Sequence, residues 1–150
     1  MKKYALWILP GLAVLLADRA VKAAAAGAHR PLIPGVIGLN WTENSGMALG
    51  LLQGGTVGIL ILTAALILVC ALLLRGVRLR GLAPVAVSMM AGGALGNLID
   101  RVSLGYVQDM IELLFMRFYI FNVADAGVVL GAVLCGASLL FRPQDWSRKP

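Results

Sequence analysis

The sequence is poor in charged residues and rich in apolar ones. Asp, Glu, Lys and Arg make up 13% of its 150 residues, well below the roughly 25% that is usual in soluble domains. Hydrophobic residues make up 60%, and the mean hydropathy is +0.89. This composition excludes a water-soluble globular enzyme, and it excludes disordered and collagen-like chains as well. The length is that of one domain, so we expect a small polytopic membrane protein.

Cysteine and histidine are also scarce, which excludes several kinds of catalytic site. Two cysteines are too few for a disulfide-stapled fold, and both Cys70 and Cys135 lie in apolar runs, where we expect small buried side chains. The single histidine, His29, is predicted to be a surface residue in a loop. The sequence has no cluster with metal-ligand spacing, no G-x-S-x-G motif and no second histidine to act as a base. Carboxylates are the catalytic groups that remain.

Four runs with few or no charges predict four transmembrane helices, at about residues 4–26, 57–74, 81–99 and 122–141. Each run approaches the roughly 20 apolar residues that are needed to cross a bilayer. We therefore predict an all-α polytopic membrane protein, a single integral membrane domain that covers residues 1–150.

Two segments between the predicted helices have a different character. Residues 27–55 are rich in Pro and Gly and predict turns with one or two short strands, and residues 101–121 predict an aromatic, amphipathic loop in the membrane interface. Together they are expected to form a small extracytoplasmic β-rich cradle with an interfacial loop. Residues 110–120 of that loop are expected to act as a mobile lid.

The positive charges predict the orientation. Eight of the 13 Lys and Arg residues, but one of the seven acids, fall at the termini and in the loop between the second and third spans. Since cytoplasmic segments carry the excess of Lys and Arg, both termini are predicted to be cytoplasmic. The sequence pI of about 9.9 then reflects topology and contact with anionic lipids, and no aromatic-basic surface for nucleic acid is visible.

Polar residues gather at the end of the third predicted span. At helical spacing, this segment presents two neighbouring faces: Gly92, Gly96 and Asp100 on one, and Gly93, Asn97 and Arg101 on the next. Close helix packing explains the glycines. It does not explain the three polar residues, and because buried polar groups need partners, we predict a polar network at the outer end of this helix.

Other polar residues allow both a structural and a functional interpretation. Asn122 and Asp125 have the spacing of a helix N-cap with a favourable charge in the first turn. Asp109 fits a solvated loop as well as a catalytic site. Asp18 and Lys22 are spaced for an ion pair on one helix face.

Taken in order, these polar groups match a set of motifs: Asp18-x-x-x-Lys22, Asn44-x-Gly46-x-Ala48, Gly92-Gly-x-x-Gly-Asn-x-x-Asp-Arg101, Val107-x-Asp109 and Phe121-Asn-x-Ala-Asp125. In this set and order the chain resembles lipoprotein signal peptidase, the type II signal peptidase of bacteria and an intramembrane aspartic peptidase. The resemblance covers nearly the whole chain, and the motif that ends at Arg101 is its most specific part. Arg19 stands where Gln is common, and Met47 and Leu49 where Ala and Phe are common. These departures leave the catalytic positions intact.

The resemblance implies that the protein removes the signal peptide from diacylglyceryl-modified prolipoproteins, by a cut just before the modified cysteine. By the same resemblance, Asp109 and Asp125 are the catalytic pair. Seven further residues would bind substrate or support the site: Asp18, Asn44, Gly46, Asn97, Asp100, Arg101 and Asn122. No metal or organic cofactor is implied.

The resemblance also implies a place and partners for the chain. The protein is expected in the bacterial cytoplasmic (inner) membrane as a multi-pass protein, with its active site at the extracytoplasmic side. Its expected partners are the prolipoprotein substrate and membrane lipids, with no nucleic acid, and the chain is expected to be a monomer.

Two other functions compete on the residues alone. A small proton- or ion-coupled transport protein would use Asp18, Asp100 and Asp125 along a path, but it would spread its acids across the bilayer, whereas six of the seven are predicted on one side. A non-catalytic subunit that packs through Gly92 and Gly96 gives the aspartates no role. Composition and spacing do not identify the lipid-modified substrate, which rests on the resemblance.

Overall fold

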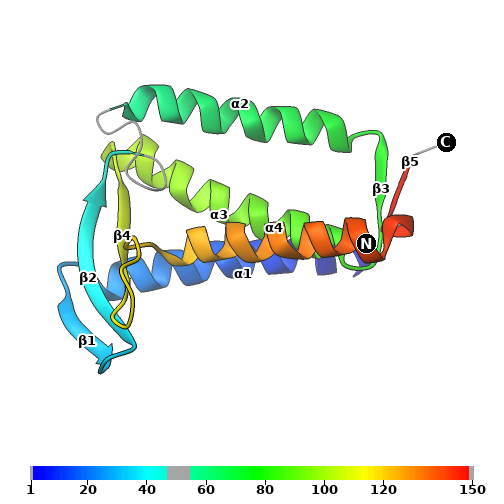
Figure 1. The fold of residues 1–150 in the computed structure, drawn as a ribbon. Coiled ribbons are helices and arrows are strands. Elements are labelled where there is room, and N and C mark those ends of the chain that lie inside the picture. The colour runs from blue at the N-terminus through cyan, green and yellow to red at the C-terminus, as the bar shows by residue number, and fades with distance from the viewer. Residues whose placement is uncertain (1, 47–54, 149–150) are drawn as a thin grey trace.

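Three long helices pack side by side in the computed structural model, which describes residues 2–46 and 55–148. They are α1 (Lys2–Ala24), α3 (Ala83–Leu104) and α4 (Val123–Phe141), and α3 makes extensive contact with both of the others. Helix α2 (Thr56–Leu74) runs along the same bundle but touches it sparsely, and Figure 1 shows it set apart from the other three.

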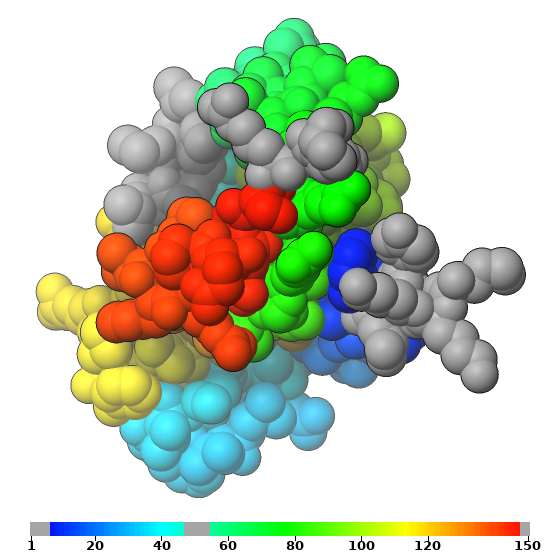
Figure 2. All heavy atoms as spheres, turned by 90° about the vertical axis from the view of Figure 1, so that its right-hand side faces the viewer, coloured from blue at the N-terminus to red at the C-terminus, as the bar shows by residue number. Residues whose placement is uncertain are grey.

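A small antiparallel sheet closes each end of the bundle (Figure 1). At one end, β1 (His29–Ile33), β2 (Ile37–Asn44) and β4 (Val107–Leu113) pair in the order β1-β2-β4. At the other end, where α1 begins, β3 (Val77–Leu79) pairs with β5 (Trp146–Arg148), which follows the short 3-10 turn Pro143–Asp145. Viewed from the β3–β5 end in Figure 2, β1 and β2 (cyan) and the segment after β4 (yellow) project sideways beyond the helices.

Glycines set the distance between the three packed helices. A Cβ on Gly92 would collide with the backbone of Gly11 in α1, and a Cβ on Gly93 would collide with the carbonyl oxygen of Ala124 in α4. The two faces predicted for α3 are therefore confirmed, since one faces α1 and the next faces α4. Close backbone approach through small residues is the usual way in which helices pack within a membrane.

The large apolar side chains lie mostly on the outside of the bundle. Leu73, Leu140 and Phe141 are each at least 70% exposed, whereas the buried apolar residues include Ala25, Ala83, Ala86 and Ala124. A soluble protein does not expose an apolar surface of this extent. Two of the described helices, α2 and α4, are long and apolar enough to cross a membrane.

The three-stranded sheet rests on the end of α1. Leu39 of β2 and Met110 of β4 pack against Ala25, and Trp41 and Val21 lie at the margin of this cluster. The turn between β1 and β2 contains Gly35 at φ 73°, a left-handed conformation that favours glycine. The cluster fixes the sheet to the bundle, so β4 has a defined position beside the ends of α1 and α3.

Three expectations differ from the structure. Residues 101–104, expected in the interfacial loop, belong to α3, which ends at Gly105, whose φ of 84° terminates the helix. Residues 110–113, expected to begin a mobile lid, belong to β4, and Met110 is fully buried. Cys70 was expected to be buried but is exposed on α2, because that helix presents nearly all of its surface outward.

Candidate active site

Asp109 lies in β4 and is almost completely buried, with 2% of its surface exposed. Its two carboxylate oxygens accept hydrogen bonds from the side-chain amides of Asn44 (2.9 Å) and Asn122 (2.6 Å). Burial raises the pKa of Asp109 to about 6, and the negative charge of Asp125 acts in the same direction, against the lowering effect of the two amides. Asp109 therefore exchanges a proton near neutral pH, as a general acid or base must.

Asp125 lies in the first turn of α4. Its backbone N–H donates to the side-chain oxygen of Asn122 (2.8 Å), and its carboxylate accepts from the backbone N–H of Asn122 (3.3 Å), which together form a capping box. The other carboxylate oxygen accepts from the side-chain amide of Asn97 in α3 (2.7 Å). The predicted N-cap is thus confirmed, and the same contacts fix the orientation of this carboxylate.

Asn122 links the two aspartates. Its side-chain amide donates to Asp109 and also to the side-chain oxygen of Asn97 (3.1 Å), while its side-chain oxygen and backbone N–H hold Asp125. Asn122 is completely buried, and its contact with Asp109 is buried as well. One residue at the start of α4 therefore joins an aspartate on a strand to an aspartate on a helix.

Asn44 and Arg101 lie at the edge of the site next to Gly46. The side-chain oxygen of Asn44 accepts from the backbone N–H of Gly46 (2.9 Å), and the Arg101 guanidinium donates to the Gly46 carbonyl oxygen (3.0 Å). Arg101 is also close enough to Asp109 and Asp125 to attract both carboxylates. It supplies positive charge beside the pair.

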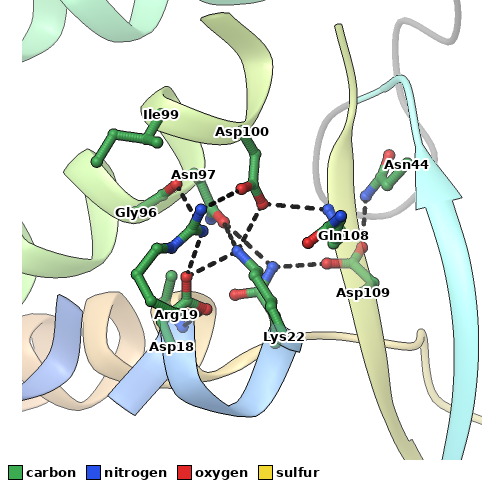
Figure 3. Close-up of polar contacts among 12 residues, drawn as sticks. Asp18, Arg19, Lys22, Asn44, Gly96, Asn97, Ile99, Asp100, Gln108 and Asp109 are labelled. Carbon is green, nitrogen blue, oxygen red and sulfur yellow. Dashed lines mark hydrogen bonds and ion pairs between the residues drawn. The ribbon is translucent and has the colours of Figure 1, made fainter. Parts of the chain in front are cut away.

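A cluster of four charged residues lies beside Asp109 (Figure 3). Lys22 contacts the carboxylates of Asp18 (2.8 Å) and Asp100 (2.6 Å), and Arg19 contacts the same two carboxylates (2.7 and 2.6 Å). Asp18 and Asp100 are completely buried, and Lys22 is 3% exposed. We refer to Asp18, Arg19, Lys22 and Asp100 as the ion cluster.

The structure brings all nine of the predicted site residues into this one region: Asp18, Asn44, Gly46, Asn97, Asp100, Arg101, Asp109, Asn122 and Asp125. Two members of the ion cluster, Arg19 and Lys22, were not among them. The spacing of Asp18 and Lys22 was a signal for Lys22, and it indicated an ion pair. Sequence spacing alone could not show that Arg19 and Lys22 both reach Asp100 on another helix.

The chemistry available here is that of two carboxyl groups with amide and guanidinium donors around them. One carboxyl has a pKa of about 6, so the pair can hold one proton and one negative charge near neutral pH. Within residues 2–46 and 55–148, no three His, Cys, Asp or Glu side chains are grouped to hold a metal ion.

Comparison with known proteins places this arrangement in a family. The family model described as signal peptidase (SPase) II matches residues 11–141. The chain belongs to the signal peptidase II family. Membership makes it an aspartic peptidase, the class to which a buried Asp109 and a half-buried Asp125, joined through Asn122, are suited.

Individual relatives agree with this family assignment. The lipoprotein signal peptidase of Lactobacillus johnsonii is 32% identical over 145 residues, which cover 93% of this chain and 94% of the relative. That of Caldanaerobacter subterraneus subsp. tengcongensis is 38% identical over 112 residues, covering 75% and 77%. A solved bacterial membrane enzyme matches with a TM-score of 0.81 and 29% identity, over 97% of this chain and 94% of that structure. The chain is therefore similar in sequence to bacterial lipoprotein signal peptidases, and in fold to a bacterial membrane enzyme, along nearly its whole length.

Proposed function

We propose that this signal peptidase II cleaves bacterial prolipoproteins just before a cysteine that carries a diacylglyceryl group, and that Asp109 and Asp125 activate the attacking water. The observation that carries the proposal is the pair of aspartates joined through Asn122 at one end of the bundle. The competing transport function would need acids along a path through the bundle. It is not favoured, because Asp18 and Asp100 share the same cation, Lys22, in one cluster.

The residues match the requirements of peptide hydrolysis. The reaction needs a base to take a proton from water, an acid to give one to the leaving amine, and donors for the oxyanion. Two nearby carboxyl groups do not ionise together easily, and the pKa of Asp109 is raised to about 6 by burial and by the charge of Asp125. In this proposal the ionised carboxyl deprotonates the water and the protonated one donates to the substrate. The apparent pKa values belong to the pair.

The membrane arrangement is part of the proposal. Four spans, at about residues 4–26, 57–74, 81–99 and 122–141, would place both termini in the cytoplasm and the aspartates at the extracytoplasmic side of the inner membrane. The exposed apolar surface of the bundle and the basic residues near β3 support this arrangement. Phe115, Phe118 and Tyr119, all more than half exposed after β4, suit the membrane interface. A cysteine anchored by acyl chains would lie at that depth.

The test is cleavage by the purified protein in detergent, with two precursors that differ only in the diacylglyceryl group. Mass spectrometry of the products identifies the bond that is cut. We expect cleavage of the modified precursor alone, just before its cysteine, and loss of cleavage in the Asp125→Asn variant.

The matched control is Asp145→Asn, which replaces a buried carboxylate at the opposite end of the bundle. This variant should cleave at the rate of the unsubstituted protein. Equal cleavage of both precursors would reject the proposed substrate, and full activity in Asp125→Asn would reject the proposed pair.

A further inference from the structure

The ion cluster is connected to the backbone next to each of the two aspartates. Asp18 accepts a hydrogen bond from the backbone N–H of Ala124 (3.0 Å), which directly precedes Asp125. Asp100 accepts one from the backbone N–H of Gln108 (3.2 Å), which directly precedes Asp109. Each acid of the cluster therefore binds the backbone N–H of the residue that directly precedes one member of the proposed catalytic pair.

The two cations connect these acids to each other. Lys22 and Arg19 each contact both Asp18 and Asp100, with nitrogen-to-oxygen distances between 2.6 and 2.8 Å. Lys22 also lies 3.5 Å from the side-chain oxygen of Asn97, whose amide donates to Asp125. A continuous series of contacts thus runs from the backbone beside Asp109, through Asp100, the cations and Asp18, to the backbone beside Asp125.

Stability alone does not account for this cluster. Removing a charge from water costs several kcal/mol, and an apolar group of similar volume often gives equal or greater stability. Asp18, Asp100 and Lys22 are all at most 3% exposed. The cluster lies where α1, α3, α4 and β4 meet, between the elements that carry the two aspartates.

We propose that Lys22 and Arg19 are positioning residues for the peptidase reaction, which hold Asp109 and Asp125 at a fixed separation by bridging Asp18 and Asp100. This inference rests on the proposed roles of Asp109 and Asp125. Lys22 has the larger part, because it is buried and also touches Asn97, whereas the Arg19 side chain is 32% exposed.

The cations also balance the negative charge around the pair. Several charged groups lie around the aspartate pair and its neighbours: Lys22 and Asp18 from α1, Asp100 and Arg101 from α3, and Glu43 of β2, which pairs with Gln108 beside Asp109. Loss of Lys22 leaves one additional uncompensated negative charge among them. A negative environment favours the protonated form of a carboxyl group, so it raises the apparent pKa values of the pair.

The experiment compares Lys22→Met with the unsubstituted protein across pH, using the diacylglyceryl-modified precursor. We expect kcat to fall by on the order of 100-fold, since small displacements of catalytic groups have effects of that size, with KM changed less than about threefold. Both limbs of the pH profile should move to higher pH. Arg19→Gln should change kcat in the same direction but less, because Arg19 is partly exposed.

Arg30→Gln is the matched control, because it removes one positive charge from an exposed position on β1. It should leave kcat and both limbs unchanged. Lys22→Met with unchanged kcat and unchanged limbs would overturn the proposal. The proposed roles of Asp109 and Asp125, on which this inference rests, are checked separately. Activity in Asp125→Asn would reject the proposed pair, whereas an inactive Asp125→Asn together with an unaffected Lys22→Met would reject only the positioning role.

A second variant keeps the test valid if Lys22→Met does not fold. Asp18→Asn combined with Lys22→Met removes one charge of each sign, and the Asn oxygen can still accept from Ala124. We expect a reduced kcat, because the bridge is lost, and pH limbs close to those of the unsubstituted protein, because the charge is balanced. An unchanged kcat in this double variant would overturn the positioning role.

Discussion

The two ends of the helix bundle use the same contact for different purposes. At the β3–β5 end, the Asp145 carboxylate accepts from the backbone N–H of Leu82 (3.2 Å), just before α3 begins, and the Asp145 carbonyl accepts from Arg80 (2.9 Å). At the other end, Asp18 and Asp100 accept backbone N–H groups in the same way. A buried aspartate on a backbone donor is thus common to both ends.

The ends differ in what lies next to that contact. Asp145 fastens the chain after α4 to the start of α3, and the nearby Trp146 side chain donates to Ser138 (3.0 Å). At the site end, the residues that follow the bound N–H groups are Asp109 and Asp125. The comparison indicates that such a contact is sufficient to fasten a loop; at the site end the same contact directly precedes the two proposed catalytic side chains.

Among substitutions at the two ends of the bundle, Asn122→Ala is expected to have the largest effect on the cleavage rate. This change removes the donor to Asp109 and the side-chain acceptor that caps α4. Misplacement of a catalytic group typically lowers a rate by about 100-fold, while loss of a cap costs about 1 kcal/mol of stability. Cleavage rates and unfolding of the purified variant measure the two effects. A variant that unfolds more easily but cleaves normally would contradict the linking role of Asn122.

The pH dependence of stability gives the next largest effect. The pKa of Asp109 is raised from 3.8 to about 6, so the folded protein keeps a proton that the unfolded chain loses between about pH 4 and 6. Stability is therefore lost as pH rises through this range, by about 3 kcal/mol for a shift of roughly two units.

Asp109→Asn removes this titration. Its free energy of unfolding, measured at intervals from pH 4 to pH 7, should increase relative to that of the unsubstituted protein as the pH rises. If the difference between the two proteins were constant over this range, Asp109 would not be the group with the raised pKa.

Alanine substitutions at two similarly crowded glycines, Gly93 and Gly131, distinguish an effect on helix packing from an effect on catalysis. A Cβ on Gly93 would press against Ala124, next to Asp125, whereas a Cβ on Gly131 would press against Met90 and Ala86, in the half of the bundle nearer β3. Both alanine variants should lose about 1–3 kcal/mol of stability. We expect only Gly93→Ala to lower kcat as well.

The control is Gly136→Ala, because a Cβ at that position meets no atom within 4 Å. Thermal unfolding and cleavage of the three variants, measured in the same detergent, complete the comparison. Equal kcat in Gly93→Ala and Gly131→Ala would show that the spacing of α3 and α4 does not govern the site.

The smallest effect is expected for Asp145→Asn. The substitution weakens one hydrogen bond to Leu82, which corresponds to about 1 kcal/mol, and it lies far from the aspartate pair along the bundle (Figure 1). The melting temperature should fall slightly while kcat/KM stays constant. A marked loss of cleavage would mean that the two ends are coupled, and that the distinction between them is wrong.

Much of the site was predictable because its signals are local. The spacing from Gly92 to Arg101 predicted two helix faces, and Asn122 with Asp125 predicted an N-cap; the structure shows both. These patterns depend on neighbours within about one helical turn, which the sequence displays directly. The family resemblance added the assignment of Asp109, whose surroundings come from four separate elements.

The remainder depends on contacts between distant segments. The pairing of β3 with β5 involves two strands of three residues each, which are too short to show an alternating pattern. The pairing of Asp100 in α3 with Arg19 and Lys22 in α1 joins segments about 80 residues apart, which sequence spacing does not show. Cys70 was misassigned because an apolar run does not reveal whether a helix faces protein or its surroundings.

The most direct test of the account is a double-mutant cycle on Asp109 and Asp125. Single-turnover cleavage of the modified precursor is measured for Asp109→Asn, Asp125→Asn and the double variant, each confirmed to be folded. Because the two carboxyl groups are proposed to act as one unit, each single change should reduce the rate at least about 1,000-fold, and the double change should be no worse than either. Losses that multiply in the double variant, or a single variant that keeps its activity, would contradict the central claim.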